Sequence, residues 1–304
     1  MLTMFTIFVF FLLNLIAEEQ MSRIGVSLIK FGNRIFKPVR HPFNLADSGE
    51  MSYAEWQYEK GMDTVACYAP KYKTYDMFED KTVLDMGCGA AGKSLYYVSQ
   101  GASRVVGVDI VQRYEREAEE LAKKLGYEKK FSFVCASAFD LPFPDQSFDT
   151  IIMNDFMEHV SRPADALKEA YRLLRSGGRI FVNFPPYLHP YGAHLTDAIN
   201  TPWCQVLWSE KSLISAYHDL VRGLPDEKER ISLRFSYDEN GREYMSYINK
   251  MTLVKFRKVL KEAGLTPEYY AEIPLRKFLT PLAKIPGVKE MFVRMGVCVI
   301  RREG

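Results

Sequence analysis

The chain has 304 residues, a formal net charge of +2 and a hydrophobic fraction of 47%. This length is sufficient for one large α/β domain with additions. The near-balanced charge excludes a protein whose bulk electrostatics attract nucleic acid. The five cysteines are widely spaced and form no C-x-x-C pair. They favour a reduced compartment and predict neither a disulfide framework nor a zinc site.

Residues 1–20 are an apolar segment, and residues 1–17 are nearly all apolar. Their length is at the short edge of a membrane span, and they lack the basic leader of a secretory signal. The bases that follow are Arg23, Lys30, Arg34, Lys37 and Arg40. By the positive-inside rule we expect a cytoplasmic protein, attached to the inner face of the membrane through this segment. In a second interpretation, translation begins at Met21.

Residues 21–79 predict an N-terminal helical cap. Residues 21–37 mix aliphatic and basic side chains, so they either lie on an anionic membrane surface or pack on the domain as a lid helix. Residues 50–61 predict a helix with three aromatic residues. These residues either line a pocket or pack in the core; they are Tyr53, Trp56 and Tyr58.

Residues 80–186 alternate between apolar runs and helical patterns, which predicts a doubly wound sheet. The expected strands are 82–86, 104–109, 131–135, 148–153 and 179–184, and the expected helices are 91–100, 112–125 and 163–175, the last ended by Ser176-Gly177-Gly178. Parallel strands joined by helices imply right-handed crossovers. Ligands of such sheets bind beyond the carboxyl ends of the strands.

A glycine turn, Gly87-Cys88-Gly89, follows the first expected strand and brings backbone N–H groups close to a ligand. Asp109 ends the second strand about 20 residues later, where a carboxylate meets ribose hydroxyls. Both a dinucleotide and S-adenosylmethionine (SAM) fit this pattern. Asp85, inside the first strand, would face the pyrophosphate of a dinucleotide. It suits a ligand with a cationic amino group and a sulfonium.

The stretch Leu84-Asp85-Met86-Gly87-Cys88-Gly89 resembles the first motif of the class I SAM-dependent methyltransferases. Residues 140–149 are similar to the loop and fourth strand of that family's small-molecule, type 11-like branch. The resemblance covers residues 80–185. It implies an α/β fold with a doubly wound, seven-stranded, mostly parallel sheet, and it implies SAM as the cofactor.

The same resemblance implies which residues bind SAM. Asp85 and the glycine turn would hold the methionine end, Asp109 the ribose, and the loop after the third strand the adenine. Ser137 stands where the family often has an acid, and its hydroxyl can still accept a hydrogen bond. The full expected set is Asp85, Gly87, Cys88, Gly89, Asp109, Ile110, Ser137, Ala138 and Asn154.

Residues 187–250 are expected to be an inserted lid over the substrate. Methyl transfer to a hydroxyl requires a base near the attacking oxygen. His189 and His194 are catalytic candidates by location, and His159 follows the fourth strand; each histidine can instead merely order its loop. The spacing of His189, His194 and Asp197 matches no standard metal site, so no metal is expected.

Residues 251–304 are expected to complete the sheet, with a helix at 251–263 and strands at 267–273 and 291–300. Residues 222–243 are highly charged and predict an exposed loop. The segment between the last two strands alternates basic and apolar residues. It either contacts a membrane or is a mobile surface loop.

The favoured hypothesis is a SAM-dependent methyltransferase that acts on a small-molecule or lipid-linked acceptor, at oxygen. A nucleic-acid partner is not expected because no basic stripe is present; a membrane surface is a further expected partner. Two alternatives stay open, because a fold does not fix a function. They are a non-catalytic SAM-binding or membrane-associated scaffold protein, and a dehydrogenase that binds NAD.

Overall fold

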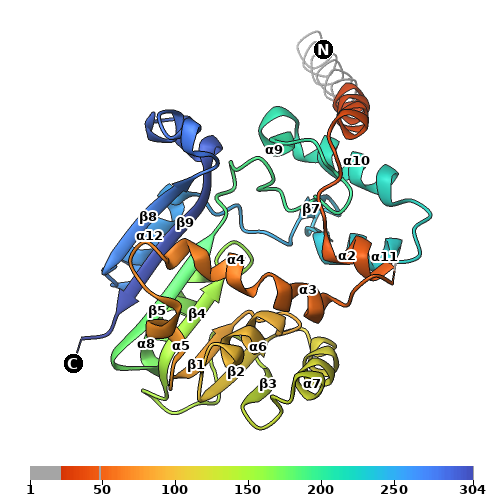
Figure 1. Ribbon diagram of the computed structural model, residues 1–304. Coiled ribbons are helices and arrows are strands. Elements are labelled where there is room, and N and C mark those ends of the chain that lie inside the picture. Colours follow the sequence, from red (N-terminus) through yellow and green to blue (C-terminus); the bar gives the residue numbers. More distant parts are fainter. Residues whose placement is uncertain (1–21, 48, 304) are drawn as a thin grey trace. The chain divides into compact units, whose positions relative to one another are not determined.

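A computed structural model describes residues 22–47 and 49–303, which divide into two compact units (Figure 1). The small unit contains residues 22–41 and 190–248, and the core unit contains residues 42–189 together with the chain from residue 249 onward. The expected lid insertion, 187–250, corresponds closely to one part of the small unit. The expected cap, 21–79, is divided between the units. The expected apolar segment, 1–20, lies outside the described residues.

The core unit is built on a seven-stranded sheet, which confirms the predicted fold class (Figure 1). Its strands, in spatial order, are β3 Phe131–Cys135, β2 Arg104–Asp109, β1 Thr82–Met86, β4 Phe148–Asn154, β5 Leu174–Phe184, β9 Val293–Arg301 and β8 Tyr269–Pro274. Only the pairs that include β9 are antiparallel. The parallel strands are continuous apolar runs because helices cover both faces of the sheet.

Alternate residues of β1 enter two different apolar clusters. Val83 packs with residues of α6 Gly92–Ser99 and α7 Tyr114–Leu125. Leu84 packs with residues of α8 Pro163–Leu173 and α12 Leu253–Ala263 on the opposite face. This alternation follows from the two-residue period of a strand.

Shorter helices precede β1 and separate β8 from β9. They are α2 Pro42–Asp47, α3 Tyr53–Glu59, α4 Gly61–Val65, η1 Ala66–Tyr68, α5 Thr74–Phe78, η2 Lys277–Leu279, η3 Leu282–Lys284 and η4 Lys289–Phe292. Helix α3 begins with a capping box, in which Ser52 accepts from the N–H of Glu55 and the Glu55 carboxylate accepts from the N–H of Ser52.

The prediction that helix α8 ends at residue 175 was wrong. The helix ends at Leu173, and β5 begins at Leu174 rather than at residue 179. Leu174 pairs with Phe148 at the start of β4, and a register shift follows. Gly177 has φ +80° within that irregularity. The glycines that suggested a helix end therefore lie inside an irregular strand.

The small unit contains the helical residues 22–35 and five further elements. They are α9 Cys204–Leu207, α10 Glu210–Val221, α11 Glu227–Arg234, β6 Phe235–Tyr237 and β7 Glu243–Met245. The prediction of an exposed loop over 222–243 was therefore wrong. Charge density suggested solvent exposure, but Arg230 and Arg234 of α11 are buried and form ion pairs with Asp197. Every helix among residues 22–47 and 49–303 is too short or too polar to span a bilayer.

Candidate functional site

Asp85 is a buried carboxylate near the end of β1 and is only 4% exposed. The Ser94 hydroxyl, from α6, donates a hydrogen bond of 2.6 Å to Asp85 Oδ2. Burial raises the pKa of Asp85 to about 6, and Asp109 adds to the rise, while Ser94 and Lys93 oppose it. Since burial disfavours the charged form, a cationic ligand group nearby would favour the carboxylate.

The glycine turn leads from β1 toward α6 in a conformation that requires glycine. Gly87 has φ +78° and Gly89 has φ +56°. The N–H groups of Gly87 and Cys88 donate to the carbonyl of Val108, at 2.8 and 3.0 Å. A Cβ atom on Gly87 would lie 2.4 Å from the Phe156 ring. The turn thus has both positive φ and a close neighbour that excludes a side chain.

Asp109 connects the turn with the end of β2. Its Oδ2 accepts from the N–H of Gly89 at 2.8 Å, and its Oδ1 accepts from the N–H of Val111 at 3.0 Å. Each carboxylate oxygen can accept a further hydrogen bond, so the group can also receive ligand hydroxyls. Ile110, the next residue, is 75% exposed.

The loop after β3 joins the same edge of the sheet. The N–H of Ala136 donates to the carbonyl of Asp109 at 3.1 Å. Ser137 is exposed, and Ala138 is partly buried against the core. The predicted ribose and adenine residues therefore lie on two loops that a hydrogen bond connects.

Asn154, at the end of β4, is buried among aromatic hydroxyls. Its Oδ1 accepts from the Tyr68 hydroxyl at 2.6 Å, and its Nδ2 donates to the Tyr97 hydroxyl at 3.3 Å. These bonds fix the amide inside the core unit. Contact between Asn154 and the methionine moiety stays a prediction.

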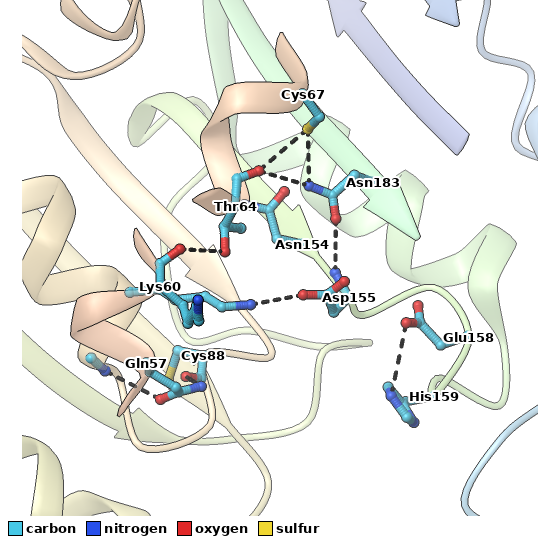
Figure 2. Close-up of polar contacts among 12 residues, drawn as sticks. Gln57, Lys60, Thr64, Cys67, Cys88, Asn154, Asp155, Glu158, His159 and Asn183 are labelled. Carbon is cyan, nitrogen blue, oxygen red and sulfur yellow. Dashed lines mark hydrogen bonds and ion pairs between the residues drawn. The ribbon is translucent and has the colours of Figure 1, made fainter. Parts of the chain in front are cut away.

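Gln57 of α3 bridges the glycine turn, and the sequence analysis did not identify it. Its Nε2 donates to the carbonyl of Cys88 at 3.2 Å, and its Oε1 accepts from the N–H of Gly92 at 3.2 Å (Figure 2). Gln57 is 4% exposed. Helix α3 is therefore bonded directly to both ends of the segment that leads into α6.

A second polar group follows β4. Lys93 Nζ lies 2.7 Å from Asp155 Oδ2. The Asn183 side chain accepts from the N–H of Asp155 at 3.2 Å (Figure 2). Burial would lower the pKa of Lys93, but Asp155 outweighs it and the pKa is raised. Lys93 directly follows Gly92 and is four residues after Gly89, a local signal that the sequence analysis did not use.

Comparison with known proteins identifies the domain that carries this geometry. A family model described as a methyltransferase domain matches residues 84–182. Residues 84–182 are thus a domain of the class I SAM-dependent methyltransferase type. SAM is accordingly its cofactor, and the predictions of family and cofactor are confirmed.

Curated relatives match only a part of this chain. It is 34% identical to the chloroplastic tocopherol O-methyltransferase of Arabidopsis thaliana over 34% of this chain and 29% of that protein. It is 28% identical to the ajmaline N-methyltransferase of Rauvolfia serpentina over 40% of this chain and 41% of that protein. The matched segments thus cover less than half of each relative.

A solved structure is similar over most of this chain. It is a protein of Galdieria sulphuraria assigned as a sarcosine dimethylglycine methyltransferase. The TM-score is 0.52, with 15% identity, over 86% of this chain and 97% of that one. At this identity the likeness supports the fold.

The residues of the methyltransferase site fit SAM by their chemistry. Asp85 can face a cationic amino group, and the oxygens of Asp109 can accept from a diol. Gly87 and Gly89 leave out the side chains that would fill the turn. Cys88 is buried, and burial raises the pKa of its thiol well above the usual range, so the residue packs rather than reacts.

The three predicted catalytic histidines of the methyltransferase have different surroundings. His159 follows β4, and its Nε2 lies 3.9 Å from Glu158 Oε1 (Figure 2). His189 is also in the core unit; burial, followed by the charge of Arg294, lowers its pKa to about 4. His194 belongs to the small unit, has φ +54° and packs edge-on against Tyr247.

Asn249 positions the loop that carries His159, and the sequence analysis did not identify it. Its Nδ2 donates to the carbonyls of Met157 and Val160, each at 2.7 Å, and its N–H donates to the carbonyl of Glu158 at 2.7 Å. Residue 249 is distant in sequence from this loop. Only the tertiary structure brings them together.

Asp197 would be the carboxylate ligand if it formed a metal site with His189 and His194. In the structure it has other partners. Tyr217 donates to its Oδ2, and Arg230 and Arg234 lie 3.4 and 3.3 Å from its oxygens. Burial acts to raise the pKa of Asp197, but Arg234, His41, Tyr217 and Arg230 outweigh it, so the pKa is lowered. The carboxylate therefore neutralises buried arginines.

Proposed function

We propose that the chain transfers a methyl group from SAM to a hydroxyl of a small-molecule or lipid-linked acceptor. The observation that supports this most strongly is the arrangement of Asp85, the glycine turn and Asp109 at the carboxyl ends of β1 and β2. It provides two carboxylates for the cationic and hydroxylated parts of one ligand. When bound, SAM supplies an electrophilic methyl group on its sulfonium.

The protein residues then have three tasks: they hold the reactants in line, exclude water and accept the proton of the hydroxyl. We propose His159 as the proton acceptor. Burial, followed by Asp155, raises the pKa of the neighbouring Glu158 well above its usual range, and Glu158 Oε1 lies 3.9 Å from His159 Nε2. The lowered pKa of His189 makes it a weaker base.

A base at this position supports oxygen as the proposed methylated atom, because a hydroxyl must lose its proton during transfer. The relatives do not decide the atom, since one is named as an O-methyltransferase and another as an N-methyltransferase. The acceptor class remains part of the proposal. A non-catalytic SAM-binding protein is the alternative that turnover would exclude.

The test is transfer of labelled methyl from SAM to molecules in a membrane lipid extract. His159→Gln should lower the rate about 100-fold or more, in the range for loss of a general base, while SAM affinity stays unchanged. His218→Gln is the matched control, because His218 pairs with Glu243 in the small unit. Equal rates in both variants would remove His159 from the reaction. SAM binding without transfer to any acceptor would favour the non-catalytic alternative.

A further inference from the structure

The helical residues 22–35 have three distinct sides, which differ in burial and in side-chain type. One side packs within the small unit through the buried residues Ser22, Gly25, Ile29 and Gly32. A Cβ atom added to Gly25 would lie 2.8 Å from Ser212 Oγ, and one added to Gly32 would lie 2.2 Å from Thr201 Oγ1. Glycines at these positions therefore let the helix lie very close to its neighbours.

Hydrogen bonds hold the helix in the same place. Asn33 Nδ2 donates to the carbonyl of Ala198 at 2.6 Å, and Asn33 Oδ1 accepts from the N–H of Asn200 at 2.8 Å. Lys30 forms an ion pair of 3.0 Å with Asp219 of α10. Because the helix is fixed in this way, its outward side has a defined composition.

The outward side is an apolar stripe. Its members are Ile24, Leu28, Phe31 and Ile35, which are 55%, 48%, 58% and 62% exposed. They are spaced by four, three and four residues, so at about 100° per residue they lie within an arc of about 60°. Such a line of large exposed apolar residues on one helix differs from single exposed residues, which need no explanation.

A basic row follows one edge of the apolar stripe. It contains Arg23, Lys30 and Arg34. A groove beside it is also lined by Lys211 and by one acid, Asp219, which pairs with Lys30. The sequence from residue 20 to residue 46 contains five Lys and Arg residues and no Asp or Glu, although the whole chain has a net charge of only +2. The positive charge is thus concentrated next to the stripe.

An apolar stripe with a basic edge matches the surface of an anionic bilayer, in which acyl chains receive the apolar side chains and headgroups receive the bases. The sequence adds an independent argument, because residues 1–17, just upstream, are nearly all apolar. We propose that the outward side of residues 22–37 binds the surface of an anionic phospholipid bilayer. This proposal does not depend on the proposed methyl transfer.

The proposal is tested on the full chain by hydroxyl-radical footprinting with mass spectrometry. We expect Leu28 and Phe31 to lose reactivity when vesicles of phosphatidylcholine with phosphatidylglycerol are added, and to keep it with pure phosphatidylcholine. Tyr75 of α5 is 66% exposed and serves as the internal reference. Protection without vesicles that grows with protein concentration would indicate a second copy on the stripe and would overturn the proposal.

Variants distinguish vesicle binding through the apolar stripe from vesicle binding through other parts of the chain. Phe31→Asp combined with Ile35→Asp should reduce binding to the anionic vesicles about tenfold or more, because two inserting side chains become charged. Tyr75→Asp is the matched control and should bind as the wild type. Circular dichroism verifies that each variant is folded. If the full chain floats with vesicles while Leu28 and Phe31 stay fully reactive, another segment binds the lipid and the proposal is wrong.

Discussion

The ionised form of Asp85 lowers the stability of the folded protein, but it is the form that a cationic ligand would favour. Its pKa is raised from the ordinary value of 3.8 to about 6, so the folded protein disfavours the ionised form. At about 1.4 kcal/mol per pKa unit, this difference costs up to about 3 kcal/mol of folding free energy above pH 6. A cationic cofactor group beside this carboxylate would offset the cost, as the proposed function requires.

Asp85→Asn is therefore expected to stabilise the folded protein and to weaken SAM binding. At pH 8 the free energy of unfolding should rise, by up to about 3 kcal/mol, because no charge is buried. SAM affinity should fall about tenfold or more, because an ion pair is lost. Urea unfolding and calorimetry measure the two quantities. Unchanged SAM affinity in a folded variant would mean that Asp85 does not face the cofactor.

The same carboxyl predicts a pH dependence of binding. Below about pH 6 the wild-type Asp85 becomes protonated in the ligand-free protein, so SAM affinity should decrease as the pH falls through this range. The affinity of Asp85→Asn should lack this decrease. Calorimetry across pH 5 to 8 distinguishes the two curves, and parallel curves would contradict the assignment.

Sequence was a good guide to residues whose position in the fold follows from local spacing. Asp85, Gly87, Gly89 and Asp109 could be predicted because a strand, a turn and the next strand place them at one edge of a sheet. Gln57 was not predictable, since it reaches the turn from 31 residues before Cys88 and no local pattern marks it.

At the level of elements, the approach of α3 to α6 depends on Gly92. A Cβ atom on Gly92 would lie 1.9 Å from the carbonyl oxygen of Ala54. We expect Gly92→Ala to separate the helices and to lower the free energy of unfolding by about 2 kcal/mol or more, as overpacking does. Gly126→Ala is the control, because it has a positive φ and open space, and only the backbone cost of about 1 kcal/mol applies. If urea unfolding gave equal losses of unfolding free energy for the two variants, the close contact between Gly92 and Ala54 would not be important.

Elements were predicted well where apolar periodicity determines them, as in β1, β2 and α7. The failures have a common physical cause, which is that tertiary pairing overrides local composition. Residues 227–234 contain six polar or charged residues out of eight, yet Arg230 and Arg234 point inward because Asp197 neutralises them. A sequence pattern does not show which charges have buried partners.

At the scale of the whole molecule, acid should destabilise both units. His41 in the small unit and His189 in the core unit each have a pKa lowered to about 4, mainly by burial. The unfolded chain binds these protons near pH 6.5 and the folded chain only near pH 4, so stability falls as the pH falls between these values. Each histidine contributes up to about 3 kcal/mol. Urea unfolding measures how much the free energy of unfolding decreases between pH 7 and pH 5. His41→Asn and His189→Asn should each make this decrease smaller. An unchanged decrease would contradict the burial of that histidine.

The central claim is that the edge formed by Asp85, the glycine turn and Asp109 binds SAM. The most direct measurement is calorimetric titration of the full chain with SAM and with S-adenosylhomocysteine, beside Asp109→Ala and an NAD titration. The account predicts micromolar-range binding of both compounds, its loss in a folded Asp109→Ala variant, and no binding of NAD. A folded wild-type protein that binds NAD but not SAM would contradict it.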